Sequence, residues 1–362
     1  MPDFTKYSIP ARILFREKMM LNRITDSWNT YVDSRMSRDD ANQIRKRLVS
    51  NRGRKIIDKK LDKKIKAYCR KAFGSSSYWP WIALYTELRG EFKEGWMPDD
   101  YYRFRLLPKV NPEKFMKFSE AKTIDYKLFN ESIVAPIIFR TNGRYYNKGG
   151  TFKEISEVRK ILDSIKGEVI IKPADGHSGK EIMFKKSKEI KLEELPEETD
   201  LVIQKVVSQH PELQKLYPYS VNTFRVMTYL GQDGSVEVKF IINRFGRAGI
   251  RVDNASSGGA WIYVNLDGTV ETFGYDFIGN KIGQKHPDTH IQYSELKFPF
   301  IDKVISFCKE VHLSFPYVRI VGWDVFVDEN EEPKLIEWNA NNPFFNVIEA
   351  HFGPYFADLL EY

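Results

Sequence analysis

The sequence has little cysteine and no long apolar run. Its two cysteines, Cys69 and Cys308, lie far apart among 362 residues and form no Cys-x-x-Cys pair, which argues against a disulfide framework and a zinc–cysteine site. The N-terminal stretch MPDFTKYSIPARILFREKMM has no apolar segment of the kind that a secretory signal needs. No stretch reaches the ~18 apolar residues of a membrane span, and internal repeats and low-complexity segments are also absent. We therefore expect a cytosolic protein.

The composition is that of a folded globular protein. Hydrophobic residues make up 42% of the chain and aromatic residues 14%, which is enough apolar surface for a sizeable core. A chain of 362 residues can form two or three lobes.

Charge is unevenly distributed along the chain. Residues 1–75 contain 20 Lys and Arg against 8 Asp and Glu, a net charge of +12, so the rest carries −5 of the total of +7. This asymmetry indicates that the N-terminal part meets an anionic surface, either membrane phospholipid at the cytoplasmic face, a polyanionic glycan or, least favoured, nucleic acid. A helical face that is merely solvated would give the same pattern.

The N-terminal region, which we place at residues 1–110, is predicted to be helical. Residues 11–73 contain no proline, and apolar residues recur from Leu48 to Tyr68 at spacings of three to four. Gly74 and the serines after it end this pattern. A dense group of aromatic residues follows between Tyr78 and Phe104, which suits core packing or a lobe interface better than stacking on sugar rings.

The middle of the chain alternates between helix and strand patterns. A helix is expected over 152–166, followed by the segment GEVIIKPADGHSGKEIMFKK. In that segment, strands at Val169–Ile171 and Ile182–Phe184 enclose a loop rich in glycine, with Lys172 at the end of the first strand. Such a loop offers backbone N–H groups and lysines to phosphate oxygens, but its spacing is not that of a Walker A loop. By itself, an ordinary β-turn explains the loop equally well.

The most informative stretch is PYVRIVGWDVFVDENEEPKLIEWNANNP, residues 316–343. It predicts a hairpin of two strands, Val318–Val327 and Lys334–Asn339, joined by a polar turn. Glu337 and Asn339 are two residues apart and share one face of their strand, and the turn brings Asp324 opposite them. Two carboxylates and an amide oxygen among apolar neighbours are ligands suited to Mg²⁺, which takes its remaining ligands from water and nucleotide phosphates.

Taken in this order, these motifs resemble the ATP-grasp superfamily over about residues 115–345. The segment from Asn243 to Ala260 is similar to the Arg…Asn…Gly-Gly segment of RimK-like carboxylate–amine ligases. The helical N-terminus and the wording KPADGHSGK look most like the sugar-transfer-associated branch of the superfamily. The resemblance implies an α+β fold in which two lobes, 111–205 with the glycine-rich lid and 206–362 with the metal site, clasp ATP behind a helical, basic N-terminal extension.

The resemblance also implies site residues, each by its position in the motifs. Nucleotide binding would fall to two phosphate-holding lysines, a lid and a hinge against adenine: Lys127, Lys172, Gly176, His177, Ser178, Gly179, Lys180, Gln204, Lys205, Val206 and Val207. Metal ions would be held by Asp324, Glu337 and Asn339. Arg225 and Arg251 would stabilise the transferred phosphoryl group, while Asn254, Gly258 and Gly259 would shape the acceptor side.

The chain departs from the family pattern at two places. The hinge begins with Gln204 where many relatives have Glu, so Glu212 is the candidate for the ribose hydroxyls. Gly322 stands where many ligases have an arginine, so Arg225 is expected to supply that charge.

The implied activity is an ATP- and Mg²⁺-dependent, ADP-forming ligase that activates a carboxylate as an acyl-phosphate and joins it to an amine. The implied setting is polysaccharide or cell-surface glycan biosynthesis, with a sugar or glycan among the small-molecule partners. Phosphoryl transfer depends on metal, Lys and Arg more than on a protein nucleophile, which agrees with the lack of an evident Ser/His/Asp or Cys/His set. Two alternatives remain: an ATP-dependent phosphotransferase acting on a sugar or related molecule, and a non-catalytic nucleotide fold that binds polyanions or membrane.

Overall fold

The computed structural model describes residues 9–175, 181–196 and 199–360. The chain divides into two compact units, one of Met1–Leu107 with Ile348–Tyr362 and one of Pro108–Val347. Within the described part, none of the helices is long and apolar enough to cross a membrane.

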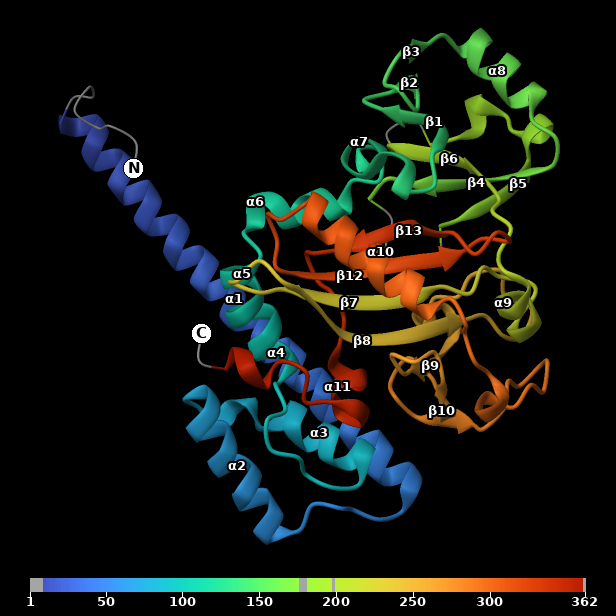
Figure 1. The fold of residues 1–362 in the computed structure, drawn as a ribbon. Helices are drawn as coiled ribbons and strands as arrows, with labels where there is room; N and C mark the ends of the chain where they lie inside the picture. The colour runs from blue at the N-terminus through green and yellow to red at the C-terminus, as the bar shows by residue number, and fades with distance from the viewer. Residues whose placement is uncertain (1–8, 176–180, 197–198, 361–362) are drawn as a thin grey trace. The chain divides into compact units, whose positions relative to one another are not determined.

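The first unit is helical. Its helices, which Figure 1 draws in blue to teal and, near the C-terminus, in red, are α1 (Ile9–Arg52), α2 (Lys59–Phe73), α3 (Trp79–Arg89), α4 (Asp99–Tyr101), a π-helical turn (Tyr102–Leu106) and most of α11 (Asn346–Phe352). The predicted helical stretch is two helices because Gly53 has φ +69°, a left-handed conformation that ends α1. Asp58 then starts α2, since its carboxylate accepts a hydrogen bond of 2.7 Å from the backbone N–H of Leu61.

The aromatic residues between 78 and 104 form much of the core of this unit. Tyr85, Trp96 and Tyr102 are completely buried, and Tyr78 and Trp81 nearly so. The prediction that these rings pack in a core is confirmed.

The second unit contains two antiparallel sheets. The first has six strands in the order β3-β2-β1-β6-β4-β5 and one covering helix, α8 (Ile155–Ser164). Its strands are β1 (Pro136–Thr141), β2 (Arg144–Asn147), β3 (Phe152–Lys153), β4 (Glu168–Pro173), β5 (Met183–Lys186) and β6 (Leu201–Lys205). The core between α8 and the sheet includes Val158, Leu162, Ile171 and Ile203.

The second sheet has seven strands in the order β11-β10-β9-β8-β7-β12-β13. They are β7 (Phe224–Leu230), β8 (Val236–Phe245), β9 (Ala260–Val264), β10 (Val270–Tyr275), β11 (Lys281–Gly283), β12 (Ile320–Val327) and β13 (Pro333–Asn339). The short helices of this unit are α5 (Leu107–Val110), α6 (Glu113–Met116), α7 (Asp125–Phe129) and α9 (Pro211–Leu216).

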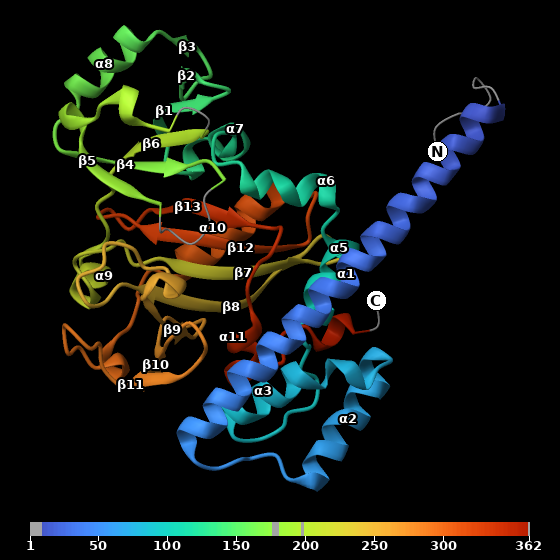
Figure 2. The ribbon, with the colours of Figure 1, turned by 180° about the vertical axis from the view of Figure 1, so that it is seen from behind.

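One long helix, α10 (Ile301–Ser314), packs against this sheet. Its Val304, Cys308 and Val311 recur at helical spacing and are buried in the same core as Trp323 and Trp338. Figures 1 and 2, taken from opposite sides, place α10 on one face of the strands β7, β12 and β13.

The predicted hairpin is confirmed as β12 and β13. Asp324 pairs directly with Glu337, and Asn339 pairs with Gly322. The turn is stabilised by Asp328, whose Oδ1 accepts hydrogen bonds from the backbone N–H groups of Asn330 and Glu332. The α+β class is likewise confirmed.

Candidate functional site

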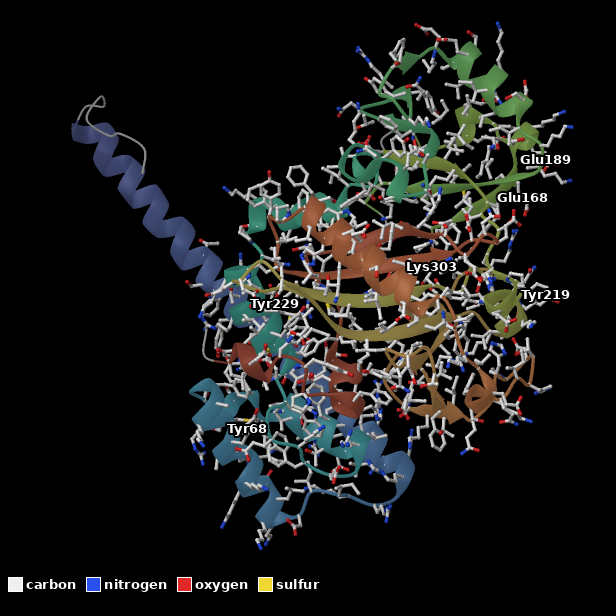
Figure 3. The ribbon with its side chains drawn as sticks, in the orientation of Figure 1. Tyr68, Glu168, Glu189, Tyr219, Tyr229 and Lys303 are labelled. Carbon is white, nitrogen blue, oxygen red and sulfur yellow. The ribbon has the colours of Figure 1, made fainter. Side chains whose placement is uncertain are left out.

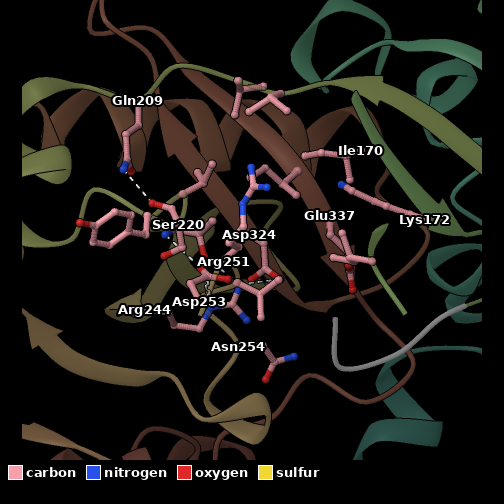
Figure 4. Close-up of a pocket in the computed structure, with 18 of the residues that line it drawn as sticks. Ile170, Lys172, Gln209, Ser220, Arg244, Arg251, Asp253, Asn254, Asp324 and Glu337 are labelled. Carbon is pink, nitrogen blue, oxygen red and sulfur yellow. Dashed lines mark hydrogen bonds and ion pairs between the residues drawn. The ribbon is translucent and has the colours of Figure 1, made fainter. Parts of the chain in front are cut away.

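A cavity of about 580 Å³ lies in the second unit and is lined by both sheets (Figure 4). Residues of β4 and β5 and the segment 206–209 line it on one side, and residues of β7, β8, β12 and β13 on the other. Its volume is within the ~300–1,000 Å³ of typical small-molecule and cofactor sites. The cavity can therefore accept a ligand of the size of a nucleotide.

The hairpin contributes a carboxylate that is almost fully buried. Asp324 is 4% exposed and receives two guanidinium groups, with 2.9 Å from Arg225 Nη2 and 3.0 Å from Arg244 Nη2 to its Oδ2. Burial alone would raise the pKa of Asp324, but these two guanidinium groups outweigh burial and hold its pKa below the usual range. Asp324 is therefore an anion at neutral pH.

Glu337 and Asn339 complete the donor set on the same face of the hairpin. Glu337 lines the cavity next to Asp324, and its Oε2 is 3.9 Å from Lys122 Nζ. Asn339 also lines the cavity, and its amide donates a hydrogen bond of 3.3 Å to the Gly322 carbonyl, which leaves its own carbonyl oxygen available.

This donor set fits Mg²⁺. Among the described residues, no group of three or more His, Cys, Asp and Glu side chains comes together as a closed metal cage. Two carboxylates and one amide oxygen at an open cavity are instead what Mg²⁺ needs when water and phosphate oxygens supply its other ligands. Asp324 would then contact the ion while it stays paired with the guanidinium groups of Arg225 and Arg244.

Lys172 points its charge into the same cavity. It is 8% exposed and lines the cavity, and within the described part of the chain its ammonium has neither an ion-pair nor a hydrogen-bond partner. Burial lowers the pKa of Lys172, and the nearby carboxylate of Glu337 opposes this effect. A buried cation without a partner of its own is complementary to a bound anion.

A second lysine at the cavity is Lys122, which sequence reasoning missed. Lys127, the lysine expected at the phosphates, is not among the residues that line the cavity, and its Nζ donates a hydrogen bond of 3.0 Å to the Gly149 carbonyl. Both lysines precede the first strand within the same short segment, and no local pattern separates one from the other. The role of Lys127 stays a prediction.

Asp125 lies behind these lysines and supports the hairpin. Its Oδ1 accepts a hydrogen bond of 2.9 Å from the indole N–H of Trp338, the residue between Glu337 and Asn339. Burial raises the pKa of Asp125 to about 7. The only part of this arrangement visible in the sequence was Trp338 itself, because Asp125 is 213 residues away.

Only part of the predicted hinge lines the cavity, and the predicted lid cannot be compared with it. Val206 and Val207 line the cavity, whereas Gln204 turns its amide to the Val134 carbonyl at 2.6 Å and borders a smaller neighbouring cavity. Lys205 is exposed and does not line the cavity. The lid residues Gly176, His177, Ser178, Gly179 and Lys180 lie outside the described residues.

Glu212, the candidate for the ribose, also lies away from the cavity lining. Its Oε1 pairs with Lys215 Nζ at 2.6 Å. Gln209, three residues before it, lines the cavity instead, and its Nε2 donates a hydrogen bond of 2.8 Å to the Ser220 carbonyl (Figure 4).

The loop after β8 contains Arg251, which was expected at the transferred phosphoryl group, and Asn254, which was expected at the acceptor side. Arg251 and Asn254 both line the cavity. The guanidinium of Arg251 pairs with Glu168 Oε2 at 2.7 Å and lies 3.9 Å from the Phe184 ring. Asn254 Oδ1 accepts a hydrogen bond of 3.0 Å from the backbone N–H of Ser256, which fixes the loop.

Gly258 and Gly259 in this loop are both positions at which a side chain would be unfavourable, for different reasons. Gly258 has φ +102°, a backbone conformation that side chains disfavour. A Cβ on Gly259 would lie 2.5 Å from the Asp253 carbonyl oxygen. The loop therefore has its shape fixed next to the cavity.

Arg244 and Asp253 are cavity residues that sequence reasoning did not assign. Arg244 pairs with Asp324, and Asp253 accepts a hydrogen bond of 3.1 Å from the backbone N–H of Thr223. The alternation of β8 could have identified Arg244, because it lies on the sheet face that Arg225 and Asp324 share.

The fold and the site together define an ATP-grasp protein. The sugar-transfer associated ATP-grasp family matches residues 101–351, more than half of the chain, and the protein belongs to this family. A comparison with curated proteins gave no match.

Solved structures with a similar fold include three that are typical. A biotin carboxylase from Campylobacter jejuni is 11% identical, with a TM-score of 0.42 and coverage of 70% of this chain and 48% of that one. An N5-carboxyaminoimidazole ribonucleotide synthetase from Thermotoga maritima is 12% identical, with a TM-score of 0.40, and the match covers 68% of this chain and 49% of that one. An L-amino acid ligase from Bacillus licheniformis is 13% identical, with a TM-score of 0.38, and the match covers 68% of this chain and 48% of that one.

The matched region thus spans about half of each of these proteins. At such identities and TM-scores, these similarities carry no argument about this protein.

Proposed function

We propose that this protein is an ATP-dependent, ADP-forming ligase that activates a carboxylate as an acyl-phosphate and joins it to an amine, in the assembly of a polysaccharide or other cell-surface glycan. The observation that carries the proposal is the cavity at which Lys172 has no partner in the described chain, while Asp324, Glu337 and Asn339 share one face of a hairpin. Membership of the sugar-transfer associated ATP-grasp family supports the setting.

Each group in the cavity suits one part of this chemistry. Lys172, with Lys122 beside it, would hold phosphate oxygens, and Val206 and Val207 would meet the adenine through their backbone. When bound at Asp324, Glu337 and Asn339, Mg²⁺ would neutralise phosphate charge.

Arg225 and Arg244 would stabilise the charge that develops on the transferred phosphoryl group. Both are fixed by Asp324, so they need no rearrangement during the reaction. Asn254 would orient the acceptor. Arg251 would also stabilise the phosphoryl group, but it would first have to exchange its contact with Glu168 for the substrate.

An ADP-release assay that pairs amino acids with hexuronic or nonulosonic acids tests this function. We expect ADP and an amide product, detected by mass spectrometry, for at least one pair, and only in the presence of both substrates and Mg²⁺. Glu332→Ala is the matched control for a Glu337→Ala variant, because Glu332 lies exposed in the turn of the same hairpin.

Other outcomes separate the alternatives. ADP formation with a phosphorylated acceptor and no amide would identify a phosphotransferase. Failure to bind MgADP in isothermal titration calorimetry would contradict both enzymatic functions and favour a non-catalytic protein.

A further inference from the structure

The strongest concentration of positive charge in the chain lies at α2 and the segment before it. Residues 54–71 contain nine Lys and Arg against two Asp, a net charge of +7, which equals the formal net charge of the whole chain. The other 344 residues are therefore neutral overall.

The apolar side of helix α2 is buried within the helical unit. Ile65, Tyr68, Cys69 and Phe73 are buried, and the Tyr68 hydroxyl donates a hydrogen bond of 2.7 Å to the Trp96 carbonyl. Tyr68 is labelled in Figure 3. The helix is thus anchored through one side, and its other side is free to carry charge.

The opposite side of α2 and the segment before the helix carry exposed cations, which together we call the α2 basic face. Its members are Arg54, Lys55, Lys59, Lys60, Lys63, Lys64, Arg70 and Lys71. None of these eight forms an ion pair with a carboxylate of the described residues. The two aspartates of the stretch are already engaged, Asp58 as the N-cap of α2 and Asp62 with Lys66 at 2.8 Å.

The spacing of these cations costs helix stability. Lys59 with Lys63, and Lys60 with Lys64, are like charges four residues apart on one face, and such pairs destabilise a helix by about 0.2–0.5 kcal/mol each. An anionic partner removes this repulsion.

We propose that the α2 basic face docks the protein onto an anionic lipid bilayer. Six of the eight cations are lysines, which are compact, hydrated point charges that need no directional contact with their partner. Attraction of this kind is what a negatively charged leaflet exerts on a basic segment. No exposed aromatic side chain lies within residues 54–71 to stack on nucleic-acid bases.

Vesicle sedimentation of the full-length protein tests the proposal. The protein is expected to sediment with vesicles of phosphatidylcholine and phosphatidylserine, and not with vesicles of phosphatidylcholine alone. Each cation near an anionic surface contributes a factor of about five, so the loss of three cations weakens binding roughly 100-fold, and the triple variant Lys59→Glu, Lys63→Glu, Arg70→Glu should bind at least that much more weakly. Binding by the unaltered protein should also fall steeply as salt rises.

The matched control reverses three exposed lysines of the second unit: Lys160→Glu, Lys166→Glu, Lys188→Glu. It changes the net charge by the same amount and should lose far less affinity than the α2 variant. Thermal melts of both variants check that they fold, so that a loss of vesicle binding can be assigned to the change of surface charge.

Three results would overturn the proposal: no binding to the anionic vesicles, equal loss of binding in both triple variants, or tighter, α2-dependent binding to an oligonucleotide than to vesicles. The last would assign the surface to nucleic acid. None of these outcomes depends on nucleotide binding, so the proposal stands or falls separately from the ligase function.

Discussion

Both units of this protein bury charged side chains, but they satisfy them differently. In the helical unit, Glu87 is 1% exposed and accepts hydrogen bonds from the backbone N–H groups of Ile56 and Ile57 and from Arg52. In the second unit, Lys172 is buried at the edge of the cavity without a partner in the described chain.

The presence or absence of partners within the chain distinguishes a buried charge that stabilises the fold from one that binds a ligand. A buried charge whose hydrogen bonds are all made by the chain stabilises the fold, and removing it leaves its partners unsatisfied. A buried charge that faces a cavity costs stability, and it is retained because something else binds there. The two classes predict opposite effects of substitution.

The largest effect is expected at the metal-binding face of the cavity. Glu337→Ala should lower kcat/KM for ADP release by about 10³-fold, because charge neutralisation at the phosphates contributes several kcal/mol to such reactions. Glu337 is partly exposed, so the melting temperature should stay close to that of the unaltered protein. Full turnover by this variant would show that the metal assignment is wrong.

At Glu87, we expect a loss of stability without a loss of nucleotide binding. Glu87→Ala should lower the free energy of unfolding by about 3 kcal/mol, because Arg52 and two backbone N–H groups lose their acceptor. Chemical denaturation measures this loss. MgADP affinity at a temperature where the variant is folded should not change, and a change would mean that the two kinds of buried charge are not distinct.

Lys172→Met should show the opposite pattern to Glu87→Ala, with weaker nucleotide binding and higher stability. Loss of a charge-assisted contact should weaken MgADP binding by about 2 kcal/mol, roughly 30-fold, in isothermal titration calorimetry. The melting temperature without nucleotide should rise, since a buried cation that lacks a partner in the described chain is removed. A fall in both quantities would indicate a structural lysine.

The effect expected at Asp125 depends on pH. Its folded-state pKa is raised from 3.8 to about 7, so the folded protein binds a proton more tightly than the unfolded chain does. The contribution of Asp125 to stability is therefore greatest below pH 3.8 and is lost as the pH rises towards 7.

Asp125→Asn keeps an acceptor for Trp338 and cannot ionise. Its melting temperature, relative to that of the unaltered protein, should therefore increase between about pH 4 and pH 7. A constant difference across this range would mean that Asp125 does not titrate there.

The sequence by itself determined the elements whose signals are local. The alternation of apolar residues and the Asp-Glu-Asn-Glu-Glu turn predicted the hairpin of β12 and β13, and with it the opposition of Asp324 and Glu337. The charge count located the basic region, and the motif order predicted the fold. Each single motif depends on residues close in sequence, and the order of the motifs along the chain supplied the rest.

Only the tertiary structure decided which distant residues meet. Arg244 joins Arg225 on Asp324, Lys122 rather than Lys127 reaches the cavity lining, and the basic face of α2 becomes one surface because its apolar side is buried. The contact of Asp125 with Trp338 spans 213 residues. Periodicity specifies the face of an element but not the partner across the core, because that choice depends on how sheets and helices pack together.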